Sequence, residues 1–64
     1  MSLILTPNIS DTDDFYAELI GSQRELSEDE ALRMNARLVL LLANHVGDRA
    51  TLSEAIRLAR TPGG

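Results

Sequence analysis

The stretch ARLVLLLANHVGD, residues 36–48, places six consecutive apolar residues, Leu38 to Ala43, inside a chain of 64. At 100° per residue, a helix through this stretch spreads its apolar side chains over an arc of about 220°. The opposite strip is narrow and polar, and Leu40 lies at its edge. We therefore expect a central helix that contacts a second helix on one flank and a third on the other, with apolar surface left over.

Three capping-box patterns mark where helices begin. In such a box a Ser or Thr side chain bonds the backbone N–H three residues on, while an acidic side chain bonds back. The patterns are Ser10 with Asp13, Ser27 with Glu30, and Thr51 with Glu54. Gly47 supplies a left-handed stop after the central helix. The predicted helices span about residues 11–22, 28–46 and 52–60.

The two ends of the chain lack helix signals. Residues 1–9 are largely apolar, and Pro7 argues against a helix there, so we expect an extended apolar arm. Residues 61–64 contain one Pro and two Gly and are expected to fray. The chain, residues 1–64, is therefore predicted to be a single all-α domain, a small three-helix bundle with an extended N-terminal arm.

The size of the chain limits how it can be stabilised. A domain of this length buries only about 60% of the surface that it exposes when unfolded. Disulfides, a metal ion or another subunit commonly stabilise such domains. There is no cysteine and a single histidine, His45, which argues against disulfides and against a structural zinc site. Association with another chain is the remaining way to stabilise this domain.

The charges divide unevenly along the chain, whose net charge is −4. Residues 1–32 carry eight acids and one Arg, whereas residues 33–64 carry two acids and five Arg, and Lys is absent. An acidic total disfavours binding to nucleic-acid phosphates. The asymmetry would suit antiparallel or head-to-tail self-association, although solvated helix surfaces are the simpler explanation.

The sequence gives no signal for a membrane or for export. Its start, MSLILTPN, has no basic stretch and too short an apolar run for a signal peptide. The run Leu38–Ala43 is far shorter than the roughly 20 apolar residues of a membrane-spanning helix. The lack of cysteine fits a reducing compartment. We expect a cytoplasmic protein.

Two polar residues stand on the apolar side of the central helix. Asn35 lies in the middle of the apolar arc, where its amide could satisfy a backbone group of a loop or of the arm near Asn8. Alternatively, it could set the register of a helix pair, as a single Asn does in a coiled coil. His45 lies in the last turn, where a cation is favoured by the helix dipole and can bond open carbonyls.

We predict contact with a partner through apolar side chains that the fold cannot cover, together with these two polar residues. The interface candidates are Phe15, Tyr16, Asn35, Leu38, Leu40, Leu41, Leu42, His45 and Leu58. We predict no catalytic, cofactor-binding or metal-binding residue, and we do not expect an enzyme. A triad of Ser53, His45 and Asp48 lacks a nucleophile elbow. The acids near Asp13 lack the order of a calcium loop and fit capping better.

Two alternatives remain open at this point. Arg57 and Arg60 lie three residues apart on the third predicted helix, as in a small DNA-binding regulator of the helix-turn-helix type, although the acidic first half would repel DNA. A small ligand could also bind in a dimer groove near His45 and Asn35.

Four segments resemble a family of short bacterial proteins known only as a domain of unknown function. These segments are PNI at 7–9, DDFYAELI at 13–20, LS at 26–27 and NARLVLLLANHVGD at 35–48. The resemblance covers most of the chain and brings no assigned activity or catalytic residue. Because such proteins tend to be encoded near flavin-dependent aromatic hydroxylases, it implies an accessory partner of an oxidoreductase.

These observations together predict a non-enzymatic helical module that works by protein–protein association. It would act either as a homodimer or as a small accessory subunit of a bacterial enzyme. The resemblance implies that this enzyme is a flavin-dependent oxidoreductase. No metal, membrane or cofactor is expected to take part.

Overall fold

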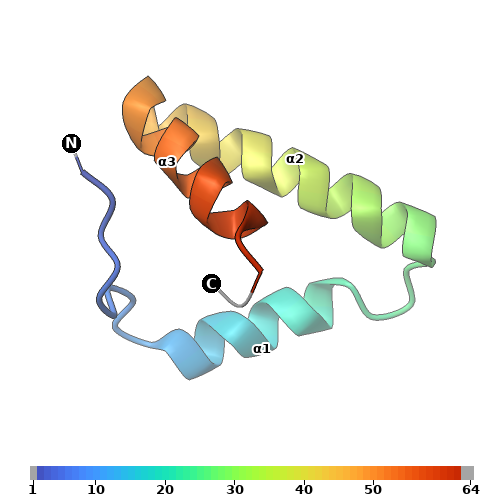
Figure 1. Cartoon of the computed structure of the whole chain (residues 1–64). Coiled ribbons are helices and arrows are strands. Elements are labelled where there is room, and N and C mark those ends of the chain that lie inside the picture. Colours follow the sequence, from blue (N-terminus) through green and yellow to red (C-terminus); the bar gives the residue numbers. More distant parts are fainter. Residues whose placement is uncertain (1, 63–64) are drawn as a thin grey trace.

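The computed structural model describes residues 2–62, which form three α-helices and no β-strand (Figure 1). The helices are α1 (Thr12–Ser22), α2 (Glu28–Val46) and α3 (Arg49–Arg60). The predicted all-α fold, a small bundle-like arrangement of three helices, is confirmed. Residues 2–9 belong to no helix or strand, and the extended form of the arm stays a prediction. Met1 of the predicted arm and residues 63–64 of the predicted tail lie outside the described residues.

Helix α1 begins one residue later than predicted, and Ser10 does not cap it. Asp11 occupies the N-cap position, because its carbonyl accepts the first helical bond from the Phe15 N–H at 3.0 Å. No side chain caps this end, so the predicted box of Ser10 with Asp13 is wrong. The Thr12 hydroxyl donates instead to the Ile9 carbonyl at 2.9 Å. This local turn shifts the helix start and leaves the Ser10 hydroxyl one position too early to cap.

Helix α2 begins and ends as its sequence predicts. The Ser27 hydroxyl accepts from the Glu30 backbone N–H at 3.2 Å, and the Glu30 carboxylate accepts from the Ser27 N–H at 2.9 Å. At the other end Gly47 has a φ of +75°, and its N–H donates to the Ala43 carbonyl at 2.9 Å. Glycine adopts this left-handed conformation without steric penalty, which stops the helix abruptly.

Helix α3 begins three residues earlier than predicted. Asp48 is its N-cap, because the carboxylate accepts from the Thr51 N–H at 2.9 Å and also from the Thr51 hydroxyl. The predicted box of Thr51 with Glu54 is therefore wrong. The physical reason is that Asp48 directly follows the Gly47 stop and is itself a strong capping residue. Only these two residues, Gly47 and Asp48, join α2 to α3.

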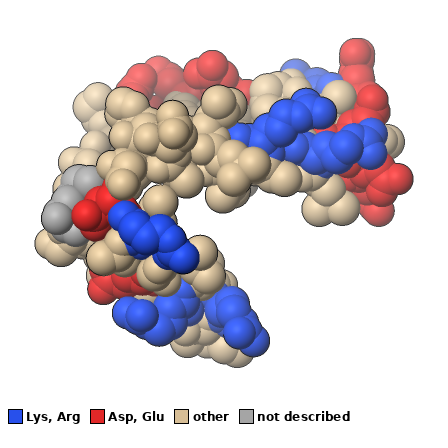
Figure 2. Space-filling view, turned by 90° about the horizontal axis from the view of Figure 1, so that it is seen from above, with Lys and Arg blue, Asp and Glu red and all other residues tan. Residues whose placement is uncertain are grey.

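The three helices form an open arrangement. Figure 2 shows a notch between the limb formed by α3 and the rest of the molecule. The radius of gyration is 13.4 Å, whereas a compact domain of 64 residues has about 11 Å. Within residues 2–62, no two helices pack against each other along their length. The expectation that α2 contacts α1 on one flank and α3 on the other is thus wrong for most of its length, because α1 and α3 diverge from α2 away from the connections that join them (Figure 1).

The openness leaves the chain without an apolar core. Among the described residues no apolar side chain is fully buried, and the only buried residue is Thr51, at 7% exposure. The accessible surface is 5855 Å², against about 4,000 Å² for a compact protein of this mass. The chain therefore exposes an excess of about 1,800 Å² over a typical folded monomer of its size.

Candidate protein-association surface

Within the three helices, the most exposed large apolar side chains lie on α2. Leu40 and Leu41 are each 69% exposed, Leu32 is 67% and Val39 is 63% exposed. A single exposed leucine is ordinary, but a continuous apolar surface on a small protein indicates an interaction site. The position of Leu40 agrees with the prediction that it lies beyond the reach of the neighbouring helices.

One set of exposed residues on α2 has the spacing of a coiled-coil seam. Its members, separated by alternating steps of three and four residues, are Leu32, Asn35, Val39, Leu42 and Val46. We call this set the α2 seam. Such spacing keeps side chains on one stripe of a helix, here within about 80°. All five are exposed, with Leu42 at 55% and Val46 at 38%.

The candidate list from the sequence included Asn35 and Leu42 but missed the other three members of the seam. Leu32, Val39 and Val46 belong to the wide apolar arc of α2, of which the sequence predicts that two neighbouring helices cover the larger part. The alternating three-and-four spacing was the signal that could have identified them. In a wide apolar arc, several overlapping sets of residues have this three-and-four spacing. The sequence alone therefore does not show which set stays exposed.

Asn35 is held by the connection between α1 and α2. Its side-chain carbonyl accepts a hydrogen bond from the Gln23 side-chain amide at 2.7 Å. Next to it, the Ser22 hydroxyl donates to the Met34 sulfur at 3.9 Å. The partner of Asn35 is thus a loop side chain, not the backbone group near Asn8 that one interpretation proposed. These two bonds tie the end of α1 to the first half of α2.

The other candidates are spread over all three helices. Phe15 and Tyr16 are exposed on α1, and Leu58 is exposed on α3. Leu38 is half-buried, and Leu40 and Leu41 line a shallow depression on α2 together with Arg37 and Asn44. The structure thus places exposed apolar side chains on more than one side of the molecule. It does not gather the nine candidates into one patch.

His45 lies exposed in the last turn of α2, as predicted. The two residues that a triad would need are engaged elsewhere: Asp48 accepts from Thr51, and the Ser53 hydroxyl accepts from the Arg49 guanidinium. Hydrogen bonds from the Thr51 hydroxyl and N–H hold the pKa of Asp48 below its ordinary value. The Asp48 contact caps α3 and the Arg49–Ser53 bond lies within α3, so neither contact joins a nucleophile to a base.

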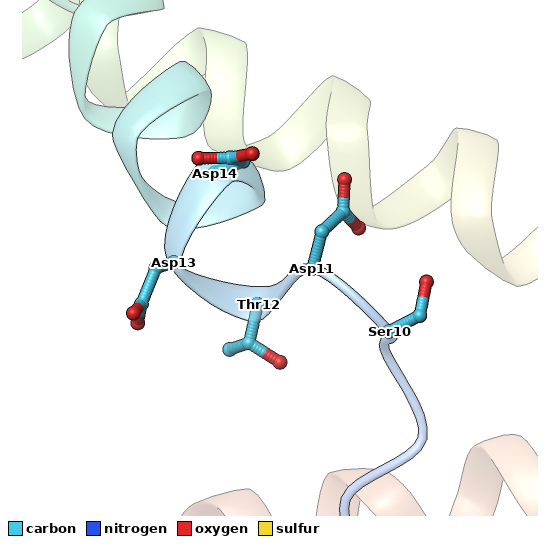
Figure 3. A pocket seen from close by; sticks show the side chains of 5 residues that line it. All are labelled: Ser10, Asp11, Thr12, Asp13 and Asp14. Atoms are coloured by element: carbon cyan, nitrogen blue, oxygen red, sulfur yellow. The ribbon is translucent and has the colours of Figure 1, made fainter.

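The acidic residues at the start of α1 do not converge on a common point. Figure 3 shows Asp11, Asp13 and Asp14 with their carboxylates pointing in different directions around the first turn. In residues 2–62 no group of three or more His, Cys, Asp or Glu side chains is placed to hold a metal ion. Asp13 and Asp14 lie in the first turn, where negative charge stabilises the positive end of the helix dipole.

Basic residues gather on α3. Arg57 and Arg60 lie in its last turn and are exposed, and basic side chains cover much of the α3 limb in Figure 2. The helix-turn-helix interpretation of this pair stays a prediction. In the described part of the chain, none of the helices is long and apolar enough to span a lipid bilayer.

The fold and this surface define a small all-α protein whose apolar side chains are largely uncovered within the single chain. The chain belongs to the family described as protein of unknown function DUF2783, whose model matches residues 3–61. The resemblance noted in the sequence is thereby confirmed. Comparisons with curated proteins and with solved structures find no match.

Proposed function

We propose that this protein is a non-enzymatic helical module that acts by binding another protein chain through the apolar surface of α2. The observation that carries the proposal is the absence of a buried apolar side chain among residues 2–62. Burying one Leu or Val contributes about 1.5–3 kcal/mol, and a small domain is stable by only about 5–15 kcal/mol. A chain that leaves most of this contribution unused needs a partner to gain it.

The exposed area supports the same function. Stable obligate interfaces bury about 2,000–5,000 Å² in total, or half of that on each partner. The excess of about 1,800 Å² on this chain falls within the range for one partner. A module that only presents a binding surface needs no pocket, and the depressions on this molecule are shallow and widely open.

The proposal has two forms. In one form the partner is another copy of the chain, and in the other the chain is a small accessory subunit of a larger bacterial enzyme. The family resemblance favours an oxidoreductase in the second form. In both forms the chain contributes contacts, and any chemistry belongs to the partner.

Sedimentation equilibrium of the purified chain tests the proposal. We expect either a mass above that of one chain at micromolar concentration or, for the accessory form, a poorly folded monomer that becomes helical on binding its enzyme. Circular dichroism measured on the same samples reports the helical content. A well-folded monomer at several hundred micromolar, with cooperative unfolding and no partner, would contradict both forms.

Co-expression separates the two forms. If the chain is an accessory subunit, co-expression with the genes encoded beside it should give a complex of fixed stoichiometry by native mass spectrometry. A matched variant with Leu40→Glu and Leu41→Glu tests whether the shallow patch with Arg37 carries that contact. Recovery of the enzyme without the chain would end the accessory form.

A further inference from the structure

We propose that the α2 seam is covered by the α2 seam of a second copy of this chain, running antiparallel about a two-fold axis. This inference rests on the proposed association function and specifies its partner. It assigns the contact to Leu32, Asn35, Val39, Leu42 and Val46 of both copies.

The spacing of the seam is the first support. Alternating steps of three and four residues keep the five side chains on one stripe through four turns of α2, from Leu32 to Val46. A stripe of this kind fits a second helix that carries the same spacing, because each side chain packs between residues of the facing helix. The seam is exposed at every position, although Asn35 bonds Gln23 of the connection between α1 and α2.

The area is the second support. Two copies packed into one body of ordinary compactness would together bury about 5,000 Å² of the surface that they expose apart. Obligate homodimers bury about 2,000–5,000 Å². A second copy therefore offers a contact within the size range of an obligate homodimer, and the α2 seam covers the part of the excess that lies on α2.

Charge favours the antiparallel direction. The first turn of α2 carries Glu28, Asp29 and Glu30, whereas the residues at its other end, His45, Asp48 and Arg49, together have a net charge near zero. An antiparallel pair keeps the two acidic turns at opposite ends of the contact. It also sets the two helix dipoles in opposite directions, which is favourable. A parallel pair would bring the two acidic turns, each with three acids, side by side.

The spacing also fixes a register. The seam has two kinds of position: Leu32, Val39 and Val46 are of one kind, and Asn35 and Leu42 are of the other. In an antiparallel pair, a position of one kind faces a position of the other kind on the partner. Val39 then faces the partner's Leu42, and Asn35 faces the partner's Val46, with the two-fold axis between Leu40 and Leu41. The Asn35 carbonyl already accepts from Gln23, so only the amide NH₂ group of Asn35 needs an acceptor or water at the contact.

Disulfide trapping tests this arrangement, and the natural chain has no cysteine to interfere. Asn35→Cys and Val46→Cys are made as separate variants, one with a longer tag, then mixed and oxidised. In the proposed register the two introduced thiols of a mixed pair lie opposite each other. Two copies of the same variant place them about 16 Å apart along the helices, beyond the reach of a disulfide.

We expect the mixed disulfide to exceed both self-disulfides at least tenfold on a non-reducing gel. Arg33→Cys mixed with Val46→Cys is the matched control, because Arg33 lies on the opposite side of α2, and this mixture should trap little. Circular dichroism before oxidation shows that each variant keeps its helices.

The outcomes separate this inference from the proposed function. A dimeric mass with self-disulfides in excess would overturn the antiparallel direction, and a dimeric mass with no trapping would overturn the seam. Either result leaves association intact as the function. A purified chain that stays monomeric would overturn the second copy as partner, and the accessory form would then be the one to examine.

Discussion

At the scale of single residues, the three capping patterns behave differently although their sequences look alike. Ser27 and Glu30 bond reciprocally, whereas Ser10 lies one position before the true N-cap of α1. Thr51 does not cap α3 but donates to Asp48, which does. A pattern reveals only that a side chain could cap. Which residue does so depends on where the preceding turn places the first helical carbonyl.

The Ser27 box is expected to stabilise α2 measurably. Ser27→Ala removes the acceptor for the Glu30 N–H and should lower the free energy of unfolding by about 1 kcal/mol. Ser10→Ala is the matched control and should have little effect, because Ser10 is not the N-cap. Urea denaturation at one fixed chain concentration measures both. Equal losses for the two variants would show that the assignment of the caps is incorrect.

Asp48 should make stability depend on pH. Its pKa is lowered from the ordinary value of 3.8 by hydrogen bonds from the Thr51 hydroxyl and N–H. A carboxyl with a lowered pKa in the folded state stabilises the fold above its unfolded pKa, and this contribution is lost as the pH falls through the folded pKa. Glu30 acts in the same direction, through hydrogen bonds from the Ser27 backbone and side chain that lower its pKa.

A substitution of Asp48 that removes the titrating carboxyl but keeps a hydrogen-bond acceptor tests this pH dependence. Asp48→Asn can still cap α3 but cannot ionise. Thermal unfolding of both proteins between pH 6 and pH 2.5 should show a smaller loss of Tm for the variant. Parallel Tm curves would mean that the Asp48 carboxylate contributes nothing in this range.

At the scale of elements, α2 carries the exposed apolar surface from which we infer association. Its apolar residues are distributed too widely for two neighbours, as the sequence predicts, and Leu40 at 69% exposure agrees with that prediction. The sequence does not reveal which stripe stays open. That depends on where α1 and α3 lie, and the Gln23–Asn35 bond and the Gly47–Asp48 connection set those positions.

Two substitutions on α2 should differ in their effect on dimerisation. Val39→Asp places a carboxylate at the centre of the α2 seam, and we expect the dimer dissociation constant to rise by about a hundredfold or more. Leu40→Asp, one residue further on, lies off the seam and should change it less than about tenfold. Sedimentation velocity over a range of concentrations measures both. Equal effects, or a larger effect of Leu40→Asp, would place the contact elsewhere on α2.

At the scale of the whole molecule, folding and association are expected to be one process. The chain exposes 5855 Å² and, within residues 2–62, fully buries no apolar side chain. Conformational entropy opposes folding by about 1–2 kcal/mol per residue, and apolar burial is the main term that offsets it. The isolated chain lacks much of that burial, so we expect contact with a partner to supply a large share of its stability.

Stability should therefore depend on concentration. For a homodimer that unfolds to separate chains, each tenfold increase in concentration should raise Tm by about 5 °C. Differential scanning calorimetry at three concentrations, each a tenfold step, measures this shift. Val39→Asp should both lower the Tm and weaken its dependence on concentration. A Tm that does not change over this range in the natural protein would argue against coupled folding and dimerisation.

The sequence by itself determined the all-α class, the presence of three helices, the beginning and end of α2 and the surplus of apolar side chains. These features depend on contacts between residues close in the chain, such as the Ser27–Glu30 box, and on periodicity along one helix. The tertiary structure alone decided that Asn35 bonds Gln23 and that no apolar side chain among residues 2–62 is fully buried. The Asp48 cap of α3 is again a contact between residues close in the chain, with Thr51. The relative placement of the helices decides which apolar stripe stays exposed, and no single helix contains that information.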